Sequence, residues 1–166
     1  MSLDGFIAAP DGSYDWIPID PDIDFGDLFA QFDTLVMGRK TYEVMQAAEG
    51  GVSDQGVYGK ETYVFSRTLA PADHPAVTVV AEDITAAVAE LKTRPGKDVW
   101  LFGGGNLFRQ LADADLVDTV EVAIVPVLLG DGIPLVPAGR RIALTLAGQR
   151  TYPRTGTVLL EYALSR

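Results

Sequence analysis

The sequence contains no cysteine, a single histidine and few basic residues. The absence of cysteine excludes disulfides and thiolate metal sites. Lys+Arg number 13 against 23 Asp+Glu, and the resulting net charge of −10 argues against a nucleic-acid or anionic-membrane surface. No apolar run approaches the roughly 18 residues of a membrane span, and no basic segment followed by a long apolar one opens the chain. We therefore expect a cytoplasmic protein that binds a small molecule, with no nucleic-acid partner, no membrane partner and no metal site.

The composition favours a folded globular protein. The chain has 166 residues, of which 48% are hydrophobic, enough to bury a core without covalent cross-links. Repeats, low-complexity tracts and linkers are not visible in the sequence. We expect one domain that covers residues 1–166.

Short apolar runs alternate with segments of helical periodicity. Phe25, Leu28, Phe29 and Phe32 recur at the spacing of one helix face. Residues 50–59 are rich in glycine and are expected to form a mobile loop. The expected strands cover 3–8, 34–37, 62–66 and 76–81; the expected helices cover 25–32, 40–48 and 83–93, with Asp83 as N-cap; and 98–114 is expected to be a strand, a triple-glycine turn and a helix.

The last third of the chain is rich in strands. Residues 157–165 follow a turn at 153–156, which predicts a closing hairpin. Strands and helices alternate in the first part of the chain, and a hairpin closes the last part. Together these patterns predict an α/β fold with three layers: a mixed, mainly parallel sheet, helices on both faces and a C-terminal antiparallel hairpin.

The segment "GRKT" lies at the junction between the strand expected over 34–37 and the helix that follows it. A helix that starts after a strand exposes unpaired N–H groups and the positive end of its dipole, which suits an anion. The residues of this first candidate segment are Gly38, Arg39, Lys40 and Thr41. A glycine turn with two solvated cations is the alternative explanation.

A second strand-to-helix junction carries three glycines. Glycines permit positive φ and let a backbone come close to a ligand. The spacing matches neither the Rossmann fingerprint nor a P-loop. Two such junctions in one sheet favour a cofactor with a pyrophosphate at the carboxyl edge. The residues of this second candidate segment are Gly103, Gly104, Gly105 and Asn106.

A third polar segment ends the strand over 62–66. Ser66, Arg67 and Thr68 supply two hydroxyls and a guanidinium, which can contact a phosphate in a planar bidentate manner. By itself this segment is more typical of a polar surface loop.

In order and content these segments resemble the dihydrofolate reductase-like superfamily, and within it the C-terminal reductase domain of the bifunctional riboflavin-biosynthesis deaminase/reductase. The resemblance covers nearly the whole chain. It is carried by "SLDGFIAAPDGSYDW", "DTLVMGRKTYE", "YVFSRTL", "DVWLFGGGNLFRQL" and "PVLLGDGIPLVP".

The resemblance implies a reductase that uses NADPH. The residues matching 38–41 would hold the cofactor phosphates, those matching Ser66 and Arg67 would lie near the adenosine 2′-phosphate, and those matching 103–105 would approach the pyrophosphate and the nicotinamide. The substrate would be a pyrimidine or pteridine-like heterocycle, as in 5-amino-6-(5-phosphoribosylamino)uracil reductase. The domains of that family commonly pair, so a homodimer is expected.

Hydride transfer needs oriented rings and a proton source, and it requires no nucleophile. Asp20, which follows a tryptophan-containing loop, and Asp4, at the end of the first strand, are the candidate catalytic carboxylates. Trp16 is the candidate for stacking on a flat substrate, with a role in the core as the alternative.

Two other functions stay open. The first is dihydrofolate reduction proper, and the second is a catalytically inactive NADPH-binding module. Family members usually have several apolar residues before the SLDG-like motif, whereas this chain begins "MSLDG". We therefore expect the first strand to be short or to start upstream.

Overall fold

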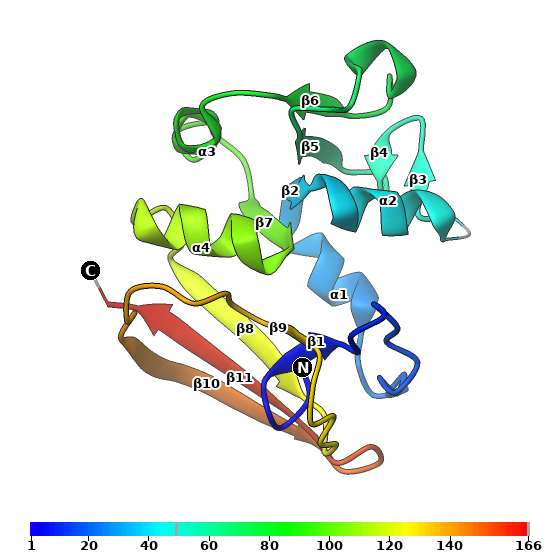
Figure 1. Ribbon diagram of the computed structural model, residues 1–166, viewed down its shortest axis with the longest axis vertical. Helices are drawn as coiled ribbons and strands as arrows, with labels where there is room; N and C mark the ends of the chain where they lie inside the picture. The colour runs from blue at the N-terminus through cyan, green and yellow to red at the C-terminus, as the bar shows by residue number, and fades with distance from the viewer. Residues whose placement is uncertain (49, 166) are drawn as a thin grey trace. The chain divides into compact units, whose positions relative to one another are not determined.

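The computed structural model describes residues 1–48 and 50–165. It separates into two compact units (Figure 1). Unit 1 comprises Met1–Asp24 and Val117–Arg166, and unit 2 comprises Phe25–Leu116. A single domain over 1–166 stays a prediction, and each unit is described by itself.

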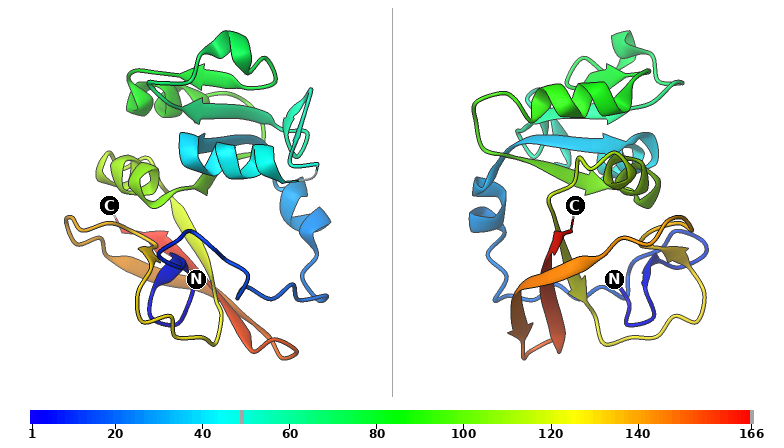
Figure 2. Two further views of the ribbon diagram at one scale, coloured as in Figure 1. Left: turned by 45° about the vertical axis from the view of Figure 1, so that its right-hand side comes forward. Right: turned by 90° about the vertical axis from the view of Figure 1, so that its left-hand side faces the viewer.

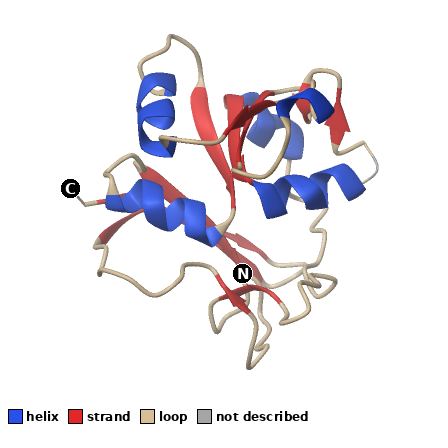
Figure 3. Ribbon diagram, turned by 45° about the horizontal axis from the view of Figure 1, so that its top comes forward, coloured by secondary structure: helices blue, strands red, loops and turns tan. Residues whose placement is uncertain are grey.

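Unit 2 is built on a four-stranded parallel sheet with strand order β6-β5-β2-β7. The strands alternate with helices along the chain (Figure 3), as the sequence pattern predicted. Its elements are α1 (Phe25–Ala30), β2 (Phe32–Gly38), α2 (Arg39–Ala47), β3 (Val52–Ser53), β4 (Gly56–Val57), β5 (Glu61–Phe65), the 3₁₀ turn η1 (Pro71–Asp73), β6 (Thr78–Val80), α3 (Ile84–Leu91), β7 (Asp98–Gly103) and α4 (Gly105–Asp113).

Strand β2 is the centre of this sheet because it is apolar on both faces. Leu35, Val36 and Met37 are at most 1% exposed. Successive side chains of a strand point to opposite faces, so a continuous buried run requires cover on both sides. The chain leaves β2 through α2 toward β5 and returns from β6 through α3 to β7. Right-handed crossovers in opposite directions place α2 and α3 on opposite faces, as the views of unit 2 show (Figure 2).

Helix α3 begins as the sequence predicted. The Asp83 carboxylate accepts a hydrogen bond from the Ala86 backbone N–H at 3.2 Å, which caps the first turn. Asp83 itself has φ of +47°, a left-handed conformation that aspartate tolerates better than most residues.

Two local predictions in unit 2 are wrong. The helix expected over 25–32 ends at Ala30, and Phe32 opens β2, where its ring stacks on Trp100 at 4.9 Å. The tertiary contact with β7 therefore overrides the helical spacing. The segment 50–59 contains an antiparallel pair, β3 with β4, rather than a plain loop. It is anchored by Val57, which is 0% exposed.

Unit 1 is made of antiparallel strands. The predicted closing hairpin is confirmed: β10 and β11 pair antiparallel, and Gly156 in the turn has φ of +72°. The first strand starts at Phe6, later than the predicted 3–8. The homodimer stays a prediction. The elements are β1 (Phe6–Ala8), which pairs β9 (Ile133–Pro134), and a three-stranded sheet in the order β10 (Leu144–Tyr152), β11 (Thr157–Leu164) and β8 (Thr119–Ile124).

The α/β class, with a mainly parallel sheet, helices and a C-terminal antiparallel hairpin, is thus confirmed. Among the helices described, none is long and apolar enough to cross a membrane.

Truncating Val57 tests the anchor of the 50–59 segment. Because Val57 is fully buried in the core cluster with Leu35 and Tyr42, Val57→Ala should lower the free energy of unfolding by about 2 kcal/mol. The matched change Val44→Ala, at a position 41% exposed on α2, should change it by less than about 0.5 kcal/mol. Urea denaturation measures both. Equal small losses would mean that the segment is loosely attached after all.

Candidate functional site

Two paired strands of unit 2 pass directly into helices through glycine. Gly38 is the N-cap of α2, and Gly104 is the N-cap of α4. Strands β2 and β7 are parallel neighbours with Met37 opposite Gly103, so both helices begin at the same edge of the sheet. Neither N-cap glycine offers a capping side chain. No N-cap side chain therefore occupies the first-turn N–H groups of either helix, and the start of such a helix suits an anion.

The fold itself does not require glycine at these two N-caps. Gly38 and Gly104 have φ of −81° and −104°, which any residue can adopt. A side chain at Gly38 would meet nothing within 4 Å, and one at Gly104 would meet only the Thr41 hydroxyl, at 3.6 Å. Space that the protein leaves open at a helix N-terminus fits the close approach of a phosphate group.

Gly103 is different because the chain needs glycine there. Its φ is +148°, and a side chain would come within 3.2 Å of the Thr41 hydroxyl. The Gly103–Gly104 peptide bond is cis. Thr41, at the start of α2, thus packs against the glycine segment of the neighbouring strand.

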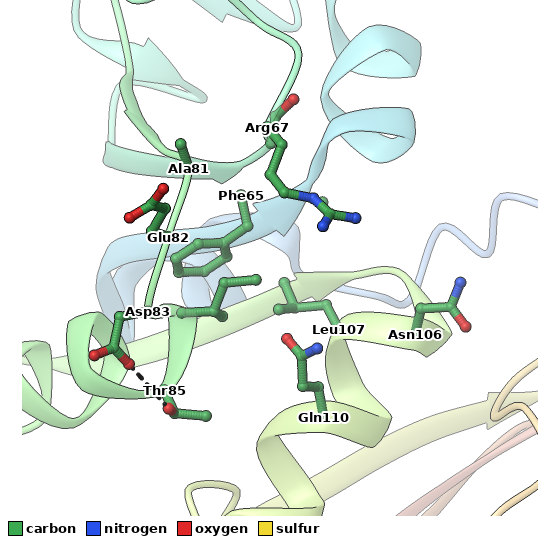
Figure 4. A pocket seen from close by; sticks show the side chains of 12 residues that line it. Phe65, Arg67, Ala81, Glu82, Asp83, Thr85, Asn106, Leu107 and Gln110 are labelled. Carbon is green, nitrogen blue, oxygen red and sulfur yellow. Dashed lines mark hydrogen bonds between the residues drawn. The ribbon is translucent and has the colours of Figure 1, made fainter.

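A cavity of about 880 Å³ opens beside these helix starts, entirely within unit 2 (Figure 4). Its walls come from the ends of β2 and β5, from the loop after β5, from the loop before α3, from the first turn of α3 and from the first two turns of α4. The lining residues are Gly38, Phe65, Ser66, Arg67, Ala81, Glu82, Asp83, Ile84, Thr85, Asn106, Leu107 and Gln110.

The structure brings four of the predicted cofactor residues into the lining of this cavity: Gly38, Ser66, Arg67 and Asn106. The other predicted cofactor residues border the same sheet edge outside the lining; they are Arg39, Lys40, Thr41, Gly103, Gly104 and Gly105.

Arg39 and Arg67 are therefore not equivalent. The Arg39 side chain is 44% exposed and lies 3.5 Å from Glu43 in an ion pair along α2. Within the described ranges 1–48 and 50–165, Arg67 makes no hydrogen bond or ion pair. A guanidinium without a protein partner at the wall of a cavity is ready to contact an anionic ligand.

Ser66 holds the loop that carries Arg67. Its hydroxyl oxygen accepts hydrogen bonds from the backbone N–H groups of Thr68 and Leu69, both at 3.1 Å. Ser66 is buried, and these bonds fix the turn that follows β5.

Several lining residues escaped the sequence analysis. Phe65, Ile84 and Leu107 form apolar walls, while Glu82 and Gln110 add polar groups. The available signal was positional: each lies at the carboxyl end of a strand, in the loop after one, or in the first two turns of the helix that follows. Their convergence depends on strand order, which the sequence pattern does not specify.

Asp20, a predicted catalytic residue, lies in unit 1 and is only 1% exposed. One carboxylate oxygen accepts a hydrogen bond from the Thr155 hydroxyl at 2.7 Å, and the other accepts one from the Asp22 backbone N–H at 2.9 Å. The Thr155 hydroxyl, followed by the Asp22 N–H, lowers the pKa of Asp20 below its usual range. Its evident structural role is to tie the loop after Trp16 to the turn between β10 and β11.

Asp4, the second predicted catalytic residue, also lies in unit 1. Its carboxylate accepts hydrogen bonds from the backbone N–H groups of Leu129 at 3.1 Å and Gly130 at 2.8 Å. The pKa of Asp4 is lowered, first by the Ser2 hydroxyl and then by the Gly130 amide. These contacts bind the start of the chain to the loop after β8.

Trp16, the predicted stacking residue, is half-buried in unit 1 and does not line the cavity of unit 2. Its indole Nε1 is buried, and the described part of the chain offers it no hydrogen-bond partner. This N–H is therefore enclosed by the protein, and the stacking of Trp16 on a substrate stays a prediction.

Comparison with known families matches residues 1–158 to the RibD C-terminal domain. The chain belongs to this family. The expected place in the dihydrofolate reductase-like superfamily, on its riboflavin branch, is thereby confirmed.

Several proteins are similar to this RibD C-terminal domain chain. YyaP, an uncharacterized protein of Bacillus subtilis (strain 168), is 36% identical over 171 residues, which cover 98% of this chain and 90% of YyaP. A crystal structure from Shewanella sp. PV-4, described provisionally as a riboflavin biosynthesis protein, has a TM-score of 0.84 at 24% identity and covers 100% of this chain and 96% of that one.

A third similar protein is the Thermotoga maritima diaminohydroxyphosphoribosylaminopyrimidine deaminase/5-amino-6-(5-phosphoribosylamino)uracil reductase. Its structure has a TM-score of 0.70 at 16% identity, and the match covers 99% of this chain and 54% of that one. At such identities the two solved structures show the shared fold.

Serine substitutions should separate the two kinds of glycine. Serine is a good N-cap residue and Gly38 has open space, so Gly38→Ser should leave the free energy of unfolding unchanged or raise it by a few tenths of a kcal/mol. Gly103→Ser places a side chain at φ of +148° against Thr41 and should lower it by about 1–2 kcal/mol. Urea denaturation of both variants is the measurement. A destabilised Gly38→Ser variant would show that the fold requires this glycine.

Proposed function

We propose that this protein is an NADPH-dependent reductase that transfers hydride to a pyrimidine or pteridine-like substrate, of the type represented by 5-amino-6-(5-phosphoribosylamino)uracil. Membership in the RibD C-terminal domain family supports a reductase of the riboflavin-pathway type. The Thermotoga maritima protein that shares the fold carries this reductase activity in its name.

The observation that carries the proposal is the pair of glycine N-caps on adjacent parallel strands. Gly38 and Gly104 start two helices at one sheet edge, and neither has a capping side chain. Two anion-binding helix starts beside one another suit the pyrophosphate of a dinucleotide. The adjoining cavity, with Arg67 at its wall, suits the adenosine end and its 2′-phosphate.

The chemistry divides between cofactor and protein. Bound NADPH supplies the hydride, and the protein's contribution is to bind and orient it. The open helix starts of α2 and α4 would hold phosphates, the apolar side chains of Phe65, Ile84 and Leu107 would exclude water around the base, and Arg67 would contact the 2′-phosphate. This assignment requires no catalytic nucleophile from the chain.

Dihydrofolate reduction proper is less well supported. That reaction would need a carboxylate open to the substrate, and Asp20 was the nearest match in the sequence. Both of its oxygens are occupied by Thr155 and Asp22. The remaining alternative is a module that binds NADPH without catalysing a reaction. Substrate assays distinguish this module from a reductase.

Removing Arg67 tests the assignment of the 2′-phosphate. A charge-assisted contact is worth on the order of 1.5–3 kcal/mol, so Arg67→Ala should weaken NADPH binding by about tenfold or more while NADH changes little. Arg39→Ala should have a smaller effect because Arg39 is exposed and paired with Glu43. Isothermal titration calorimetry gives both dissociation constants, with the exposed Arg150→Ala variant in unit 1 as control. Equal weakening of both coenzymes by Arg67→Ala would contradict the assignment.

Turnover separates the three functions. Purified protein should oxidise NADPH in the presence of the ribosylaminouracil phosphate or a related aminopyrimidine, and the loss of nicotinamide absorbance follows the reaction. Gly38→Ser should slow it through weaker cofactor binding, because a serine side chain occupies the N–H groups assigned to phosphate. Oxidation driven by dihydrofolate and lost in Asp20→Asn would favour the folate reaction. NADPH binding without oxidation by any heterocycle would leave the binding module.

A further inference from the structure

The cavity of unit 2 contains two charged side chains that have no partner among the residues that the structure describes. They are Arg67, in the loop after β5, and Glu82, in the loop between β6 and α3. Across the described residues, neither side chain makes a hydrogen bond or ion pair, and they do not pair with each other.

The other charged group of the lining is already committed. Asp83 caps α3 through the Ala86 N–H at 3.2 Å and accepts the Thr85 hydroxyl at 3.3 Å. One carboxylate oxygen accepts both hydrogen bonds, so Asp83 has a structural role in the cap of α3 and keeps its negative charge in the lining. Glu82, one residue earlier in the chain, is exposed and makes no capping hydrogen bond within residues 1–48 and 50–165.

The two free charges border different parts of the same cavity. Figure 4 shows Glu82 beside Ala81 and Asp83, and Arg67 on the opposite side of the view, with the Phe65 ring between them. A ligand that lies over Phe65 therefore comes under the influence of a cation from one wall and a carboxylate from the other.

We propose that Glu82 is a specificity-determining residue that limits the preference of this cavity for NADPH over NADH. The proposal rests on the function proposed above. A 2′-phosphate is attracted by Arg67 and repelled by Glu82, because a phosphate monoester carries about −1.5 to −2 charges at neutral pH. A 2′-hydroxyl can instead donate a hydrogen bond to a carboxylate, which is how acidic residues select NAD over NADP in dinucleotide sites.

The charges of the lining support this inference. The charged side chains of the lining are one cation, Arg67, and two carboxylates, Glu82 and Asp83, of which Asp83 also caps α3. Cavities that strongly select a 2′-phosphate gather cations around it. Because Glu82 is exposed, solvent screens its field, and its effect on the dissociation constant should be modest and should decrease as salt is added.

The test compares nucleotide affinities rather than turnover. Isothermal titration calorimetry at low salt gives dissociation constants for NADPH, NADH, 2′,5′-ADP and 5′-AMP with the wild-type protein, Glu82→Gln and Glu82→Lys. Glu82→Gln should tighten NADPH and 2′,5′-ADP by about threefold, with NADH and 5′-AMP unchanged or weaker, and Glu82→Lys should have a larger effect in the same direction. Glu161→Gln, on β11 of unit 1, removes the same charge outside the cavity and should change none of the four.

The outcomes separate the inference from the proposed function. If the wild-type protein binds NADPH but neither Glu82 variant alters the ratio of NADPH to NADH affinity, Glu82 has no role in selectivity and the inference fails alone. If Glu82→Gln weakens all four ligands equally, Glu82 is a general nucleotide contact and the inference also fails. If the folded wild-type protein binds no nucleotide at all, the proposed function and the inference fail together.

Discussion

The parallel register of β2 between β5 and β7 is the constraint on which the candidate site depends. Gly38 lies opposite Phe65 on one side, and Met37 lies opposite Gly103 on the other. These pairings bring the carboxyl ends of three strands level. A shift of two residues in the register of β2 against β7 would move Gly38 and Gly104 apart by about 6 Å or more along the sheet. One phosphate group could then no longer contact both helix starts.

Three helices of unit 2 follow strands of the parallel sheet, and they differ in whether a side chain caps the N-terminus. Helix α3 carries a carboxylate cap at Asp83, which accepts a hydrogen bond from the first-turn N–H of Ala86. Helices α2 and α4 start at glycine and have no side-chain cap. Caps of Ser, Asp or Asn stabilise a helix more than glycine does, so two glycine caps side by side give up some stability and gain access for an anion. The phosphate site proposed above is compatible with a net charge of −10, because main-chain dipoles at these helix starts act locally.

The hydrogen bonds of Asp4 and Asp20 in unit 1 make these two carboxylates poorly suited to donate a proton. Asp4 and Asp20 both have lowered pKa values because hydroxyl and amide groups donate to their charged forms. A group held in its anionic form near neutral pH is a poor proton donor and a good anchor for loops. The indole N–H of Trp16, in the same loop as Asp20, is buried and has no hydrogen-bond partner among the described residues.

The sequence by itself determined the α/β class, the N-cap at Asp83, the closing hairpin and the two glycine junctions, because each depends on local rules of helix capping, turn geometry and apolar periodicity. It misassigned Phe32, whose ring is held by Trp100 from another strand, and segment 50–59, which is anchored by the burial of Val57. Only the tertiary structure decided that Arg67 lines the cavity while Arg39 pairs with Glu43, and that Glu82 lines the same cavity with no partner in the described part of the chain. The physical reason is that strand order and register set which loops converge, and these arise from the packing of residues far apart in the chain.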